Sequence, residues 1–356
     1  MKKFLIVYHV EDNDGVCSAA IILNHLLENL HIDRKEIDLL GSTYNSLNKL
    51  QAKGVIEEEW PKQYNHIIMT DISFNDWKMM KFLHKTFGDN FTWIDHHAPI
   101  INLSKKEKFD DIQGLRSTQN SAMYNAYIYL HDPFKQEKVP YVIWMLSAWD
   151  NWNYEREGID QEFCRAFNKG FTIESNLSVN WYLEHIKMIL DPDLSPIMAF
   201  TDPTKHTAEE IVEKTEMLSY VTEIFKTGKK ACEKEDDENK EMIRVNGDKE
   251  WNVNGIPAIF VVTTGATNSL MFKSLMVDKP TASDLRIAVV AKHCSDGNWT
   301  ISLYNIYDFG GDTSNPFYFH CGKYLQEKYN GGGHEGAAGC TLTVDKFCKV
   351  LKSKTL

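Results

Sequence analysis

The sequence predicts an α/β protein whose N-terminal part is a doubly wound parallel sheet. Short apolar runs alternate with segments of helical periodicity over residues 1–155, and acidic residues follow several of the apolar runs. Because parallel strands require crossover connections, this alternation favours a sheet with helices on both faces. Strand-like runs return after Trp251, which predicts a second, smaller mixed-sheet α/β domain.

The elements of the first domain follow one another in a regular order. Apolar runs of strand length occupy residues 4–8, 37–40, 66–70 and 91–94. Segments with apolar residues at helical spacing occupy residues 16–30, 74–87 and 117–131. Residues 142–149 are apolar but favour a helix over a strand.

The rest of the chain divides into a connector and a C-terminal domain. Residues 170–250 are polar with helical periodicity, and the mixed-charge run at 229–240 is typical of a solvated face. Strand-like runs occupy residues 258–262, 285–291 and 299–304, the last after the hairpin signal Asp296-Gly297-Asn298. We expect a metal-binding domain over 1–165, a helical connector over 166–250 and a substrate-binding domain over 251–356.

Length, charge and cysteine usage narrow the function classes. A chain of 356 residues exceeds one ordinary core, which favours two domains. Its net charge of −11 argues against binding long duplex DNA, since that requires a basic surface. Its seven cysteines have no CxxC spacing, which indicates reduced thiols in the cytoplasm. The short apolar start does not fit a signal peptide, and no apolar window is long enough to span a membrane.

The triplet Asp95-His96-His97 follows the strand-like run 91–94. Successive side chains of an extended segment point to opposite sides, so one imidazole can bind a metal while the next faces a substrate. Asp12 and Asp71 likewise follow predicted strands, whereas Asp150 would reach in from a helix end. Ligands of open α/β sheets bind at the carboxyl ends of the strands, so these side chains are expected to converge.

Such a convergence predicts a metal centre. Carboxylates gathered in one crevice would repel one another by several kcal/mol unless cations lay among them. Oxygen ligands with a few imidazoles suit Mn²⁺ best, with Mg²⁺, Fe²⁺ or Co²⁺ as competitors. Two such ions would activate a water and hold a phosphoryl group, with Asp71 as the geometric favourite to bridge them. The residues in question are His9, Asp12, Asp14, Asp71, His96 and Asp150.

The individual signals also have structural explanations. An Asp-x-Asp-Gly sequence after a strand is often a turn with a helix N-cap, and His9 between Tyr8 and Val10 is compatible with a core histidine. The joint pattern favours the metal centre.

Near the C-terminus, residues 330–339 read NGGGHEGAAG. Consecutive glycines cost backbone entropy, which suggests close approach of the backbone to an anion. We expect backbone amides and a helix N-terminus to be directed at phosphate there, with His334 as a further donor. A flexible turn is the alternative.

These motifs, in this order, resemble the DHH phosphoesterase superfamily, in the subgroup with a DHHA1-type C-terminal domain. The resemblance implies a dinuclear manganese site held by the six residues named above. It also implies that His97 contacts the scissile phosphate or protonates the leaving oxygen and that Asp95 orients the histidines. By the same resemblance Gly332, Gly333 and His334 hold substrate phosphate.

The chain departs from the family pattern at two positions. His9 lies three residues before Asp12, where a spacing of two is common in the family, and Glu11 is an alternative ligand. Many relatives carry an arginine in a strand of the DHHA1 domain, and the equivalent stretch here is Ser302-Leu303-Tyr304-Asn305. Tyr304 would offer the substrate a stacking ring and a hydroxyl in place of a guanidinium.

The sequence therefore predicts a manganese-dependent phosphodiesterase that hydrolyses short oligonucleotides or cyclic or linear dinucleotides through a water activated by two metal ions. Mg²⁺ or Co²⁺ are substitutes, and a homodimer is compatible with this prediction. The alternatives are a RecJ-like single-stranded DNA 5′-exonuclease, disfavoured by the short acidic chain, and a catalytically idle nucleotide-binding protein of the same fold. Inorganic pyrophosphatases share the first motifs but lack this glycine loop.

Overall fold

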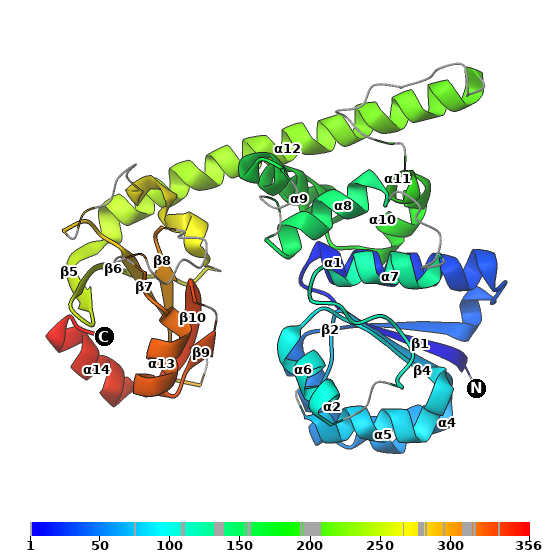
Figure 1. Cartoon of the computed structure of the whole chain (residues 1–356), viewed down its shortest axis with the longest axis horizontal. Helices are drawn as coiled ribbons and strands as arrows, with labels where there is room; N and C mark the ends of the chain where they lie inside the picture. The colour runs from blue at the N-terminus through cyan, green and yellow to red at the C-terminus, as the bar shows by residue number, and fades with distance from the viewer. Residues whose placement is uncertain are drawn as a thin grey trace. The chain divides into compact units, whose positions relative to one another are not determined.

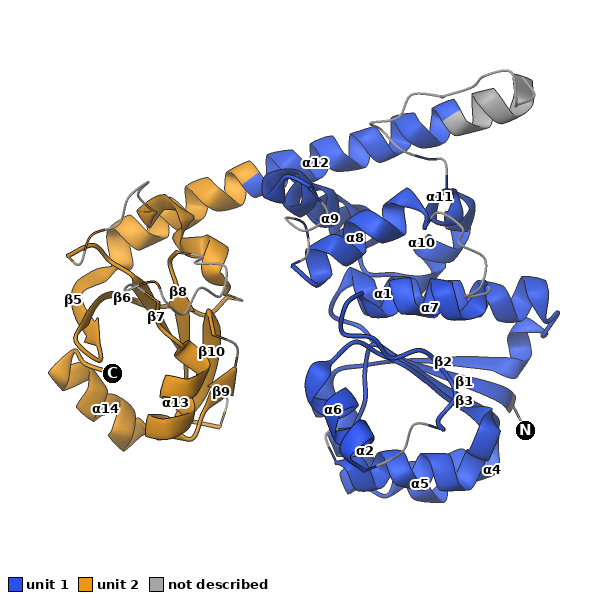
Figure 2. Cartoon of the chain, in the orientation of Figure 1, with its two compact units in different colours: residues 1–232 blue, residues 233–356 orange. Residues whose placement is uncertain are grey.

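The structure of the chain is a computed structural model. It describes residues 2–356 except 75, 108–110, 132–138, 153, 155–157, 193, 195–207, 266, 277–280, 282, 295, 308–314, 316–317 and 334, and it describes the backbone but not the side chains of residues 2 and 208–214. The chain forms two compact units, residues 1–232 and 233–356 (Figure 2). This division does not test the predicted boundaries of the metal-binding domain, the connector and the substrate-binding domain, which remain a prediction.

A four-stranded parallel sheet forms the centre of the first unit. Its strands lie in the order β2-β1-β3-β4, and every neighbouring pair is parallel. Their bounds are β1 Lys2–His9, β2 Ile37–Ser42, β3 Tyr64–Thr70 and β4 Phe91–Ile94. The predicted parallel α/β sheet is thus confirmed.

Helices cover both faces of this sheet (Figure 1). Helices α1 and α7 lie on one face, and α2, α4, α5 and α6 lie on the other. The helices of this part are α1 (Asn13–Asn24), α2 (Tyr44–Ala52), α3 (Val55–Glu58), α4 (Trp60–Gln63), α5 (Trp77–Phe87), α6 (Ala98–Lys106) and α7 (Ala122–Leu130). Helix α7 begins later than the predicted residue 117, because Ser121 is its N-cap.

Further helices complete the first unit and lead to the second. They are α8 (Tyr141–Asp150), α9 (Gln161–Ser175), α10 (Val179–Glu184), α11 (Ile186–Leu190) and α12 (Ala208–Asn246). The division between the two units falls within α12. The predicted helix over 142–149 is confirmed, and Asp150 is its last residue.

A buried polar network ties α1 to the helices that follow the sheet. The Asn13 amide donates to Oδ1 of Asn168 at 2.8 Å and to Oγ1 of Thr172 at 2.8 Å. The Tyr182 hydroxyl donates to Oδ1 of Asn13 at 2.8 Å. Because every partner here is buried or partly buried, the loss of one would leave the others unsatisfied. This network holds α9 and α10 against the N-terminus of α1, where the site residues begin.

The second unit is built on a six-stranded mixed sheet in the order β5-β6-β7-β8-β10-β9. Only β6 and β7 are parallel, so the predicted mixed sheet is confirmed. Its elements are β5 (Asp248–Val253), β6 (Ile256–Val262), β7 (Ile287–His293), β8 (Trp299–Asn305), α13 (Cys321–Tyr329), β9 (Gly332–Gly333), β10 (Ala337–Leu342) and α14 (Val344–Ser353). Separate apolar clusters cover its two faces.

The structure corrects one prediction made for the glycine run at residues 331–333. It follows the C-terminus of α13 and precedes strand β10, so no helix begins there and the predicted helix N-terminus is wrong. Gly333 has φ 145°, and a side chain on it would collide with Ala338 of β10. A side chain on Gly331 would collide with the carbonyl oxygen of Gly339. Close packing of this hairpin therefore already explains two of the three glycines.

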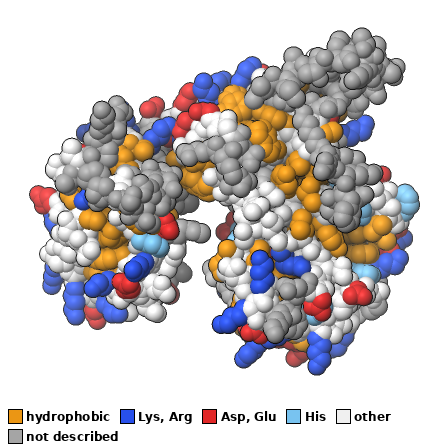
Figure 3. Space-filling view, viewed as in Figure 1, with side chains coloured by type: hydrophobic (Ala, Val, Ile, Leu, Met, Phe, Trp, Pro, Cys, Tyr) orange, Lys and Arg blue, Asp and Glu red, His pale blue; other side chains and the backbone are white. Residues whose placement is uncertain are grey.

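The surface carries charges of both signs. On the face shown in Figure 3, lysine and arginine side chains are interspersed with aspartate and glutamate. Within the part of the chain that the structure describes, no helix has both the length and the apolar character needed to cross a membrane.

Candidate metal centre

The predicted site residues of the first unit gather at the carboxyl ends of its strands. Asp71 and Asp95 follow β3 and β4 directly, and Asp12 lies three residues beyond the end of β1. Asp14 lies in the first turn of α1, and Asp150 ends α8. Parallel strands end at one edge of the sheet, so the side chains that follow them meet there.

His96 lies at the middle of this group. Its Nε2 atom is 3.2 Å from Oδ1 of Asp71, 3.4 Å from Oδ2 of Asp150 and 3.5 Å from Oδ2 of Asp14. Its Nδ1 atom lies 2.9 Å from Oδ1 of Asn151. The amide oxygen of Asn151 thus fixes the ring with Nε2 directed at the three carboxylates, which is how metal-binding histidines are oriented in proteins.

Asp71 is held in an unusual backbone conformation. Its φ is 57°, in the left-handed region that non-glycine residues rarely adopt, and the residue is 1% exposed. Its amide donates to the carbonyl oxygen of Ile94 at 3.0 Å, which extends the pairing of β3 with β4 by one bond. Its Oδ1 atom is buried without a hydrogen-bond partner. Strained backbone and an unsatisfied buried oxygen are typical of functional positions.

Asp12 combines a structural role with a place in the site. Its Oδ1 atom accepts from the amide of Gly15 at 2.9 Å and caps α1. Its Oδ2 atom lies 3.5 Å from Nε2 of His9, which is also 3.7 Å from Oε2 of Glu11. A side chain on Gly15 would collide with the carbonyl oxygen of His9, so the glycine permits this close turn. The N-cap explanation and the metal-site explanation are therefore compatible.

Asp14 is fixed by the start of another helix. Its two carboxylate oxygens accept from the amides of Ala122 at 2.7 Å and Met123 at 2.6 Å, the first two residues of α7. A helix N-terminus favours negative charge, so these contacts hold the carboxylate in a favourable position.

Asp95 is a buried hub for the histidine pair. Its Oδ1 atom accepts from Nδ1 of His97 at 2.7 Å and from the amide of His96 at 2.7 Å. Its Oδ2 atom accepts from Nε1 of Trp93 at 2.9 Å. Burial alone would raise the pKa of Asp95, but the hydrogen bond and the charge of His97 outweigh it and lower that pKa. Asp95 therefore remains ionised, and Nε2 of His97 is left for another partner.

The remaining carboxylates are electrostatically crowded. Burial and the charge of Asp14 raise the pKa of Asp71 and Asp150 well above their usual range, and that of Asp12 to a smaller extent. Burial lowers the pKa of His96, but the charges of Asp14 and Asp150 outweigh it and raise that pKa. These pKa shifts indicate that negative charge is crowded at this site and that little positive charge balances it.

The side chains present fit divalent metal ions. Two sets of donor atoms lie close enough together to share an ion, one of Asp71, His96 and His97 and one of Asp14, His96 and Asp150. Asp150 Oδ2 and His9 Nδ1, like Asp71 Oδ1, are buried without a hydrogen-bond partner. Carboxylate oxygens with imidazole nitrogen suit Mn²⁺, Mg²⁺ or Co²⁺.

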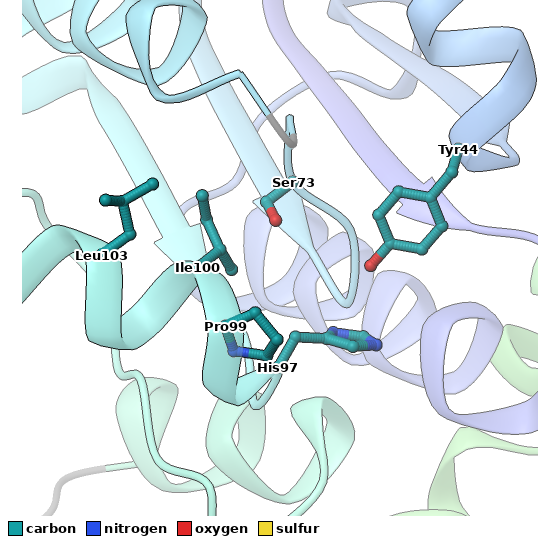
Figure 4. A pocket seen from close by; sticks show the side chains of 6 residues that line it. All are labelled: Tyr44, Ser73, His97, Pro99, Ile100 and Leu103. Carbon is teal, nitrogen blue, oxygen red and sulfur yellow. The ribbon is translucent and has the colours of Figure 1, made fainter. Parts of the chain in front are cut away.

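Two cavities lie at this site, one beside His97 and one beside the carboxylates. One of about 350 Å³ lies beside His97 and is lined by Tyr44, Ser73, Pro99, Ile100 and Leu103 (Figure 4). The Tyr44 hydroxyl and the His97 ring point toward one another in Figure 4, and their ring centroids are 6.0 Å apart. The other cavity, of about 150 Å³, is lined by Asp12, Asn13, Asp14, Met123, Leu146, Trp149, Asp150, Trp152 and Asn168.

Sequence reasoning missed three residues that border this site. Asn151 orients His96, Tyr44 lines the larger cavity, and Trp152 lines the smaller one. The position of Asn151 next to Asp150 was a usable signal. Tyr44 gave none, because its distance from His97 along the chain hides the contact between their rings.

The predicted substrate residues of the second unit are described only in part. Gly332 and Gly333 form an exposed edge strand, and His334 lies outside the described residues. The Tyr304 hydroxyl donates to the carbonyl oxygen of Thr267 at 2.9 Å and lies 3.0 Å from Oγ1 of the same residue. The hydroxyl is thus already hydrogen-bonded within the unit.

Comparison with protein-family models and with curated proteins finds no match. Among solved structures, 35 chains match. A DHH domain described as a member of the S1p family of ribosomal proteins aligns with a TM-score of 0.51 at 14% identity, over 99% of this chain and 85% of that chain. A pGpG-specific phosphodiesterase from Vibrio cholerae aligns with a TM-score of 0.42 at 15% identity, over 99% of this chain and 97% of that chain.

An uncharacterised protein from Helicobacter pylori aligns with a TM-score of 0.36 at 15% identity, over 99% of both chains. Of these three alignments, only the one with the DHH domain, at a TM-score of 0.51, supports a shared fold. At 14% identity that likeness concerns the fold alone. The chain shares its fold with that DHH-domain protein.

Proposed function

We propose that the protein is a manganese-dependent phosphodiesterase that hydrolyses short oligonucleotides or cyclic or linear dinucleotides. One observation carries the proposal: oxygens of Asp14, Asp71 and Asp150 lie within 3.5 Å of a single nitrogen of His96. Ionised carboxylates packed this closely in a buried site repel one another strongly. Divalent cations among them relieve that repulsion.

In this proposal two ions are held by six side chains, with Asp71 between them. Its central position and its unpartnered Oδ1 atom support the bridging role. The full set of proposed ligands is His9, Asp12, Asp14, Asp71, His96 and Asp150. When bound, such ions lower the pKa of a water molecule and neutralise the charge that develops on a phosphoryl group.

His97 has the geometry of a proton donor to the leaving oxygen. Asp95 accepts from Nδ1 of His97, so a proton carried on Nε2 is available to a substrate. The ionised Asp95 also stabilises the charged imidazole and holds its orientation. His97 thus contacts the scissile phosphate or protonates the leaving group, and Asp95 positions it.

Tyr44 supplies a second donor beside His97. Burial and the charges of Asp95, Asp71 and Asp12 raise the pKa of its hydroxyl far above its usual range, so the hydroxyl keeps its proton at neutral pH. The cavity that it lines has a largely apolar wall formed by Pro99, Ile100 and Leu103. A cavity of about 350 Å³ with a few polar groups is within the size range of small-molecule sites. This supports a small substrate.

In the second unit, Gly332, Gly333, His334 and Tyr304 stay proposed substrate contacts. The exposed edge strand of Gly332 and Gly333 supports a role in holding phosphate through backbone amides.

The test is a substrate panel with the purified full-length chain and Mn²⁺. The panel contains linear and cyclic dinucleotides, five-residue oligonucleotides, long single strands and pyrophosphate. Asp71→Ala and His96→Ala are the loss-of-function variants, and Asp89→Asn, an exposed aspartate of the same unit, is the matched control. We expect manganese-dependent cleavage of the short substrates by wild type and Asp89→Asn, with a loss of at least about 100-fold in the other two variants.

Other outcomes identify the alternatives. Equal rates on long and short strands would favour a single-strand exonuclease. Cleavage of pyrophosphate alone would point to a pyrophosphatase. Nucleotide binding without any manganese-dependent hydrolysis would overturn the enzyme proposal in favour of an idle binding protein.

A further inference from the structure

An aromatic group lies at the end of α8, next to Asp150. The rings of Trp149 and Trp152 are stacked with centroids 5.5 Å apart and an interplanar angle of 27°. The ring of Tyr154 lies 6.3 Å from that of Trp149 at an angle of 25° and 6.1 Å from that of Trp152. Tyr154 is buried and Trp149 is partly buried, whereas Trp152 is 49% exposed. One large ring is therefore held by its neighbours and open to solvent.

Two features of Trp152 are unfavourable for folding, despite its contacts with neighbouring rings. Its φ is 55°, a left-handed conformation that bulky residues seldom adopt, and its amide donates to the carbonyl oxygen of Trp149 at 3.1 Å. A glycine or asparagine would make this turn with less strain. The exposed ring also leaves apolar surface in water. A residue that is unfavourable in both respects is a candidate for a binding role.

Trp152 borders the same cavity as the carboxylates. The cavity of about 150 Å³ is lined by Asp12, Asp14 and Asp150 and also by Trp149 and Trp152. Asp150 is the last residue of α8, and Trp152 follows in the turn. A ligand whose phosphate lies at the carboxylates can therefore reach the indole ring with an adjoining group.

The exposed indole ring of Trp152 indicates which chemical group would bind beside the phosphate. An exposed indole already stacked on one face by another indole offers a flat, rigid surface, and every nucleobase has a complementary π-face. Inorganic pyrophosphate has no group that would use it. We propose that Trp152, supported by Trp149, is a stacking platform for one base of a nucleotide whose phosphate lies at the metal centre. The inference rests on the proposed function and assigns a binding position to one base of its substrate.

The first test measures binding without catalysis. Isothermal titration calorimetry of the full-length protein with Mn²⁺ uses AMP and ribose 5-phosphate, which differ only in the base. The variants are Trp152→Ala, Trp152→Phe and the control Ile173→Ala, an apolar residue of α9 with a similar exposure of 45%. We expect Trp152→Ala to lose about 10- to 100-fold in AMP affinity, with much of it retained in Trp152→Phe. Affinity for ribose 5-phosphate should stay the same in all variants.

Several results would overturn the role of Trp152 as a stacking platform. One is that wild type binds AMP no more tightly than ribose 5-phosphate. Another is that Trp152→Ala binds AMP as tightly as wild type does, or loses affinity for both ligands equally, which would indicate a damaged phosphate site. Unchanged AMP affinity together with an altered oligomeric state of Trp152→Ala would instead assign the ring to a protein interface.

A second measurement separates this inference from the proposed function. On a linear ribodinucleotide, Trp152→Ala should raise KM by about 10- to 100-fold and change kcat less, because stacking contributes mainly to binding. If no phosphodiester is hydrolysed but AMP affinity depends on Trp152, the proposed function fails and the platform stands. If hydrolysis proceeds and Trp152→Ala changes neither AMP affinity nor KM, the platform fails and the proposed function stands.

Discussion

Nε2 of His96 lies 3.2 Å from Oδ1 of Asp71, a buried oxygen with no hydrogen-bond partner. Asp71 directly follows strand β3, and His96 lies two residues after strand β4. The contact therefore joins the ends of two adjacent parallel strands. Two more carboxylates, Asp14 and Asp150, approach the same nitrogen. The consequences of this crowding can be measured.

Asp71→Asn should separate the effects of charge and of metal. Removing one buried negative charge should stabilise the metal-free protein at neutral pH, because Asp71 is crowded by Asp14 and Asp12. The same change should abolish stabilisation by Mn²⁺. In wild type, an ion at 100 times its Kd contributes about 2.7 kcal/mol, or roughly 5–10 °C in the Tm of a unit of this size. Differential scanning calorimetry with EDTA or with Mn²⁺ measures both effects. An equal Mn²⁺-induced shift in Asp71→Asn would exclude this residue as a ligand.

The metal-free protein should lose stability as pH rises above about 4. The folded-state pKa values of Asp12, Asp71 and Asp150 are raised, so their contribution is complete below the unfolded value of about 3.9 and is lost as pH rises through the folded values. The raised pKa of His96 acts in the same direction above about 6.5. The lowered pKa of Asp95 acts in the opposite direction, but only as pH falls below about 3.9.

The measurement is Tm against pH from 5 to 8 in EDTA, repeated with saturating Mn²⁺. Because the ions bind the deprotonated carboxylates, the difference between the two curves should grow with pH. A metal-free Tm that rises over this interval would contradict the raised pKa values.

Asp95→Asn should impair His97 without removing the metal ions. The amide keeps a hydrogen bond near Nδ1 of His97 but loses the charge that favours the imidazolium form. We expect kcat to fall by about 10- to 100-fold and its pH profile to shift, while Mn²⁺ affinity by calorimetry changes little. Buried Asp95 also accepts from Trp93, so thermal unfolding must be checked alongside. Equal loss of activity and Mn²⁺ affinity would instead indicate a direct role at the metal.

Asn151→Ala should weaken metal binding through His96. The variant removes the oxygen that lies 2.9 Å from Nδ1 of His96, so the ring loses its fixed orientation. Loss of such an orienting partner lowers metal affinity by about 10- to 100-fold. Calorimetric titration with Mn²⁺ measures this, and Asn151→Asp should restore part of the affinity because a carboxylate oxygen can accept the same hydrogen bond. Wild-type affinity in Asn151→Ala would remove Asn151 from the site.

The glycine run shows that one local signal fits two physical causes. Three consecutive glycines predict an anion-binding loop before a helix, but no helix begins there, and two of the glycines lie where a side chain would collide with β10. Both explanations require glycine for close approach. The sequence does not reveal whether the approaching group is a ligand or the neighbouring strand, because the pairing partner lies in another segment.

Much of the first unit can be predicted from the sequence because the patterns that identify its strands and helices are local. Apolar runs and helical periodicity identify strands and helices from neighbouring residues alone, and their alternation implies parallel pairing. Parallel strands end at one edge, so carboxylates after β1, β3 and β4 had to lie near one another. The sequence by itself thus determined the sheet of the first unit and the place of Asp12, Asp71 and Asp95 at its edge.

Only the tertiary structure decided how those side chains are held and what surrounds them. Asp14 is oriented by amides of α7, more than 100 positions away, and His96 by Asn151. Tyr44 and Trp152 reach the cavities from segments that share no pattern with the triplet. Such contacts depend on packing between distant elements, which close-packed interiors fix only once the whole unit has folded.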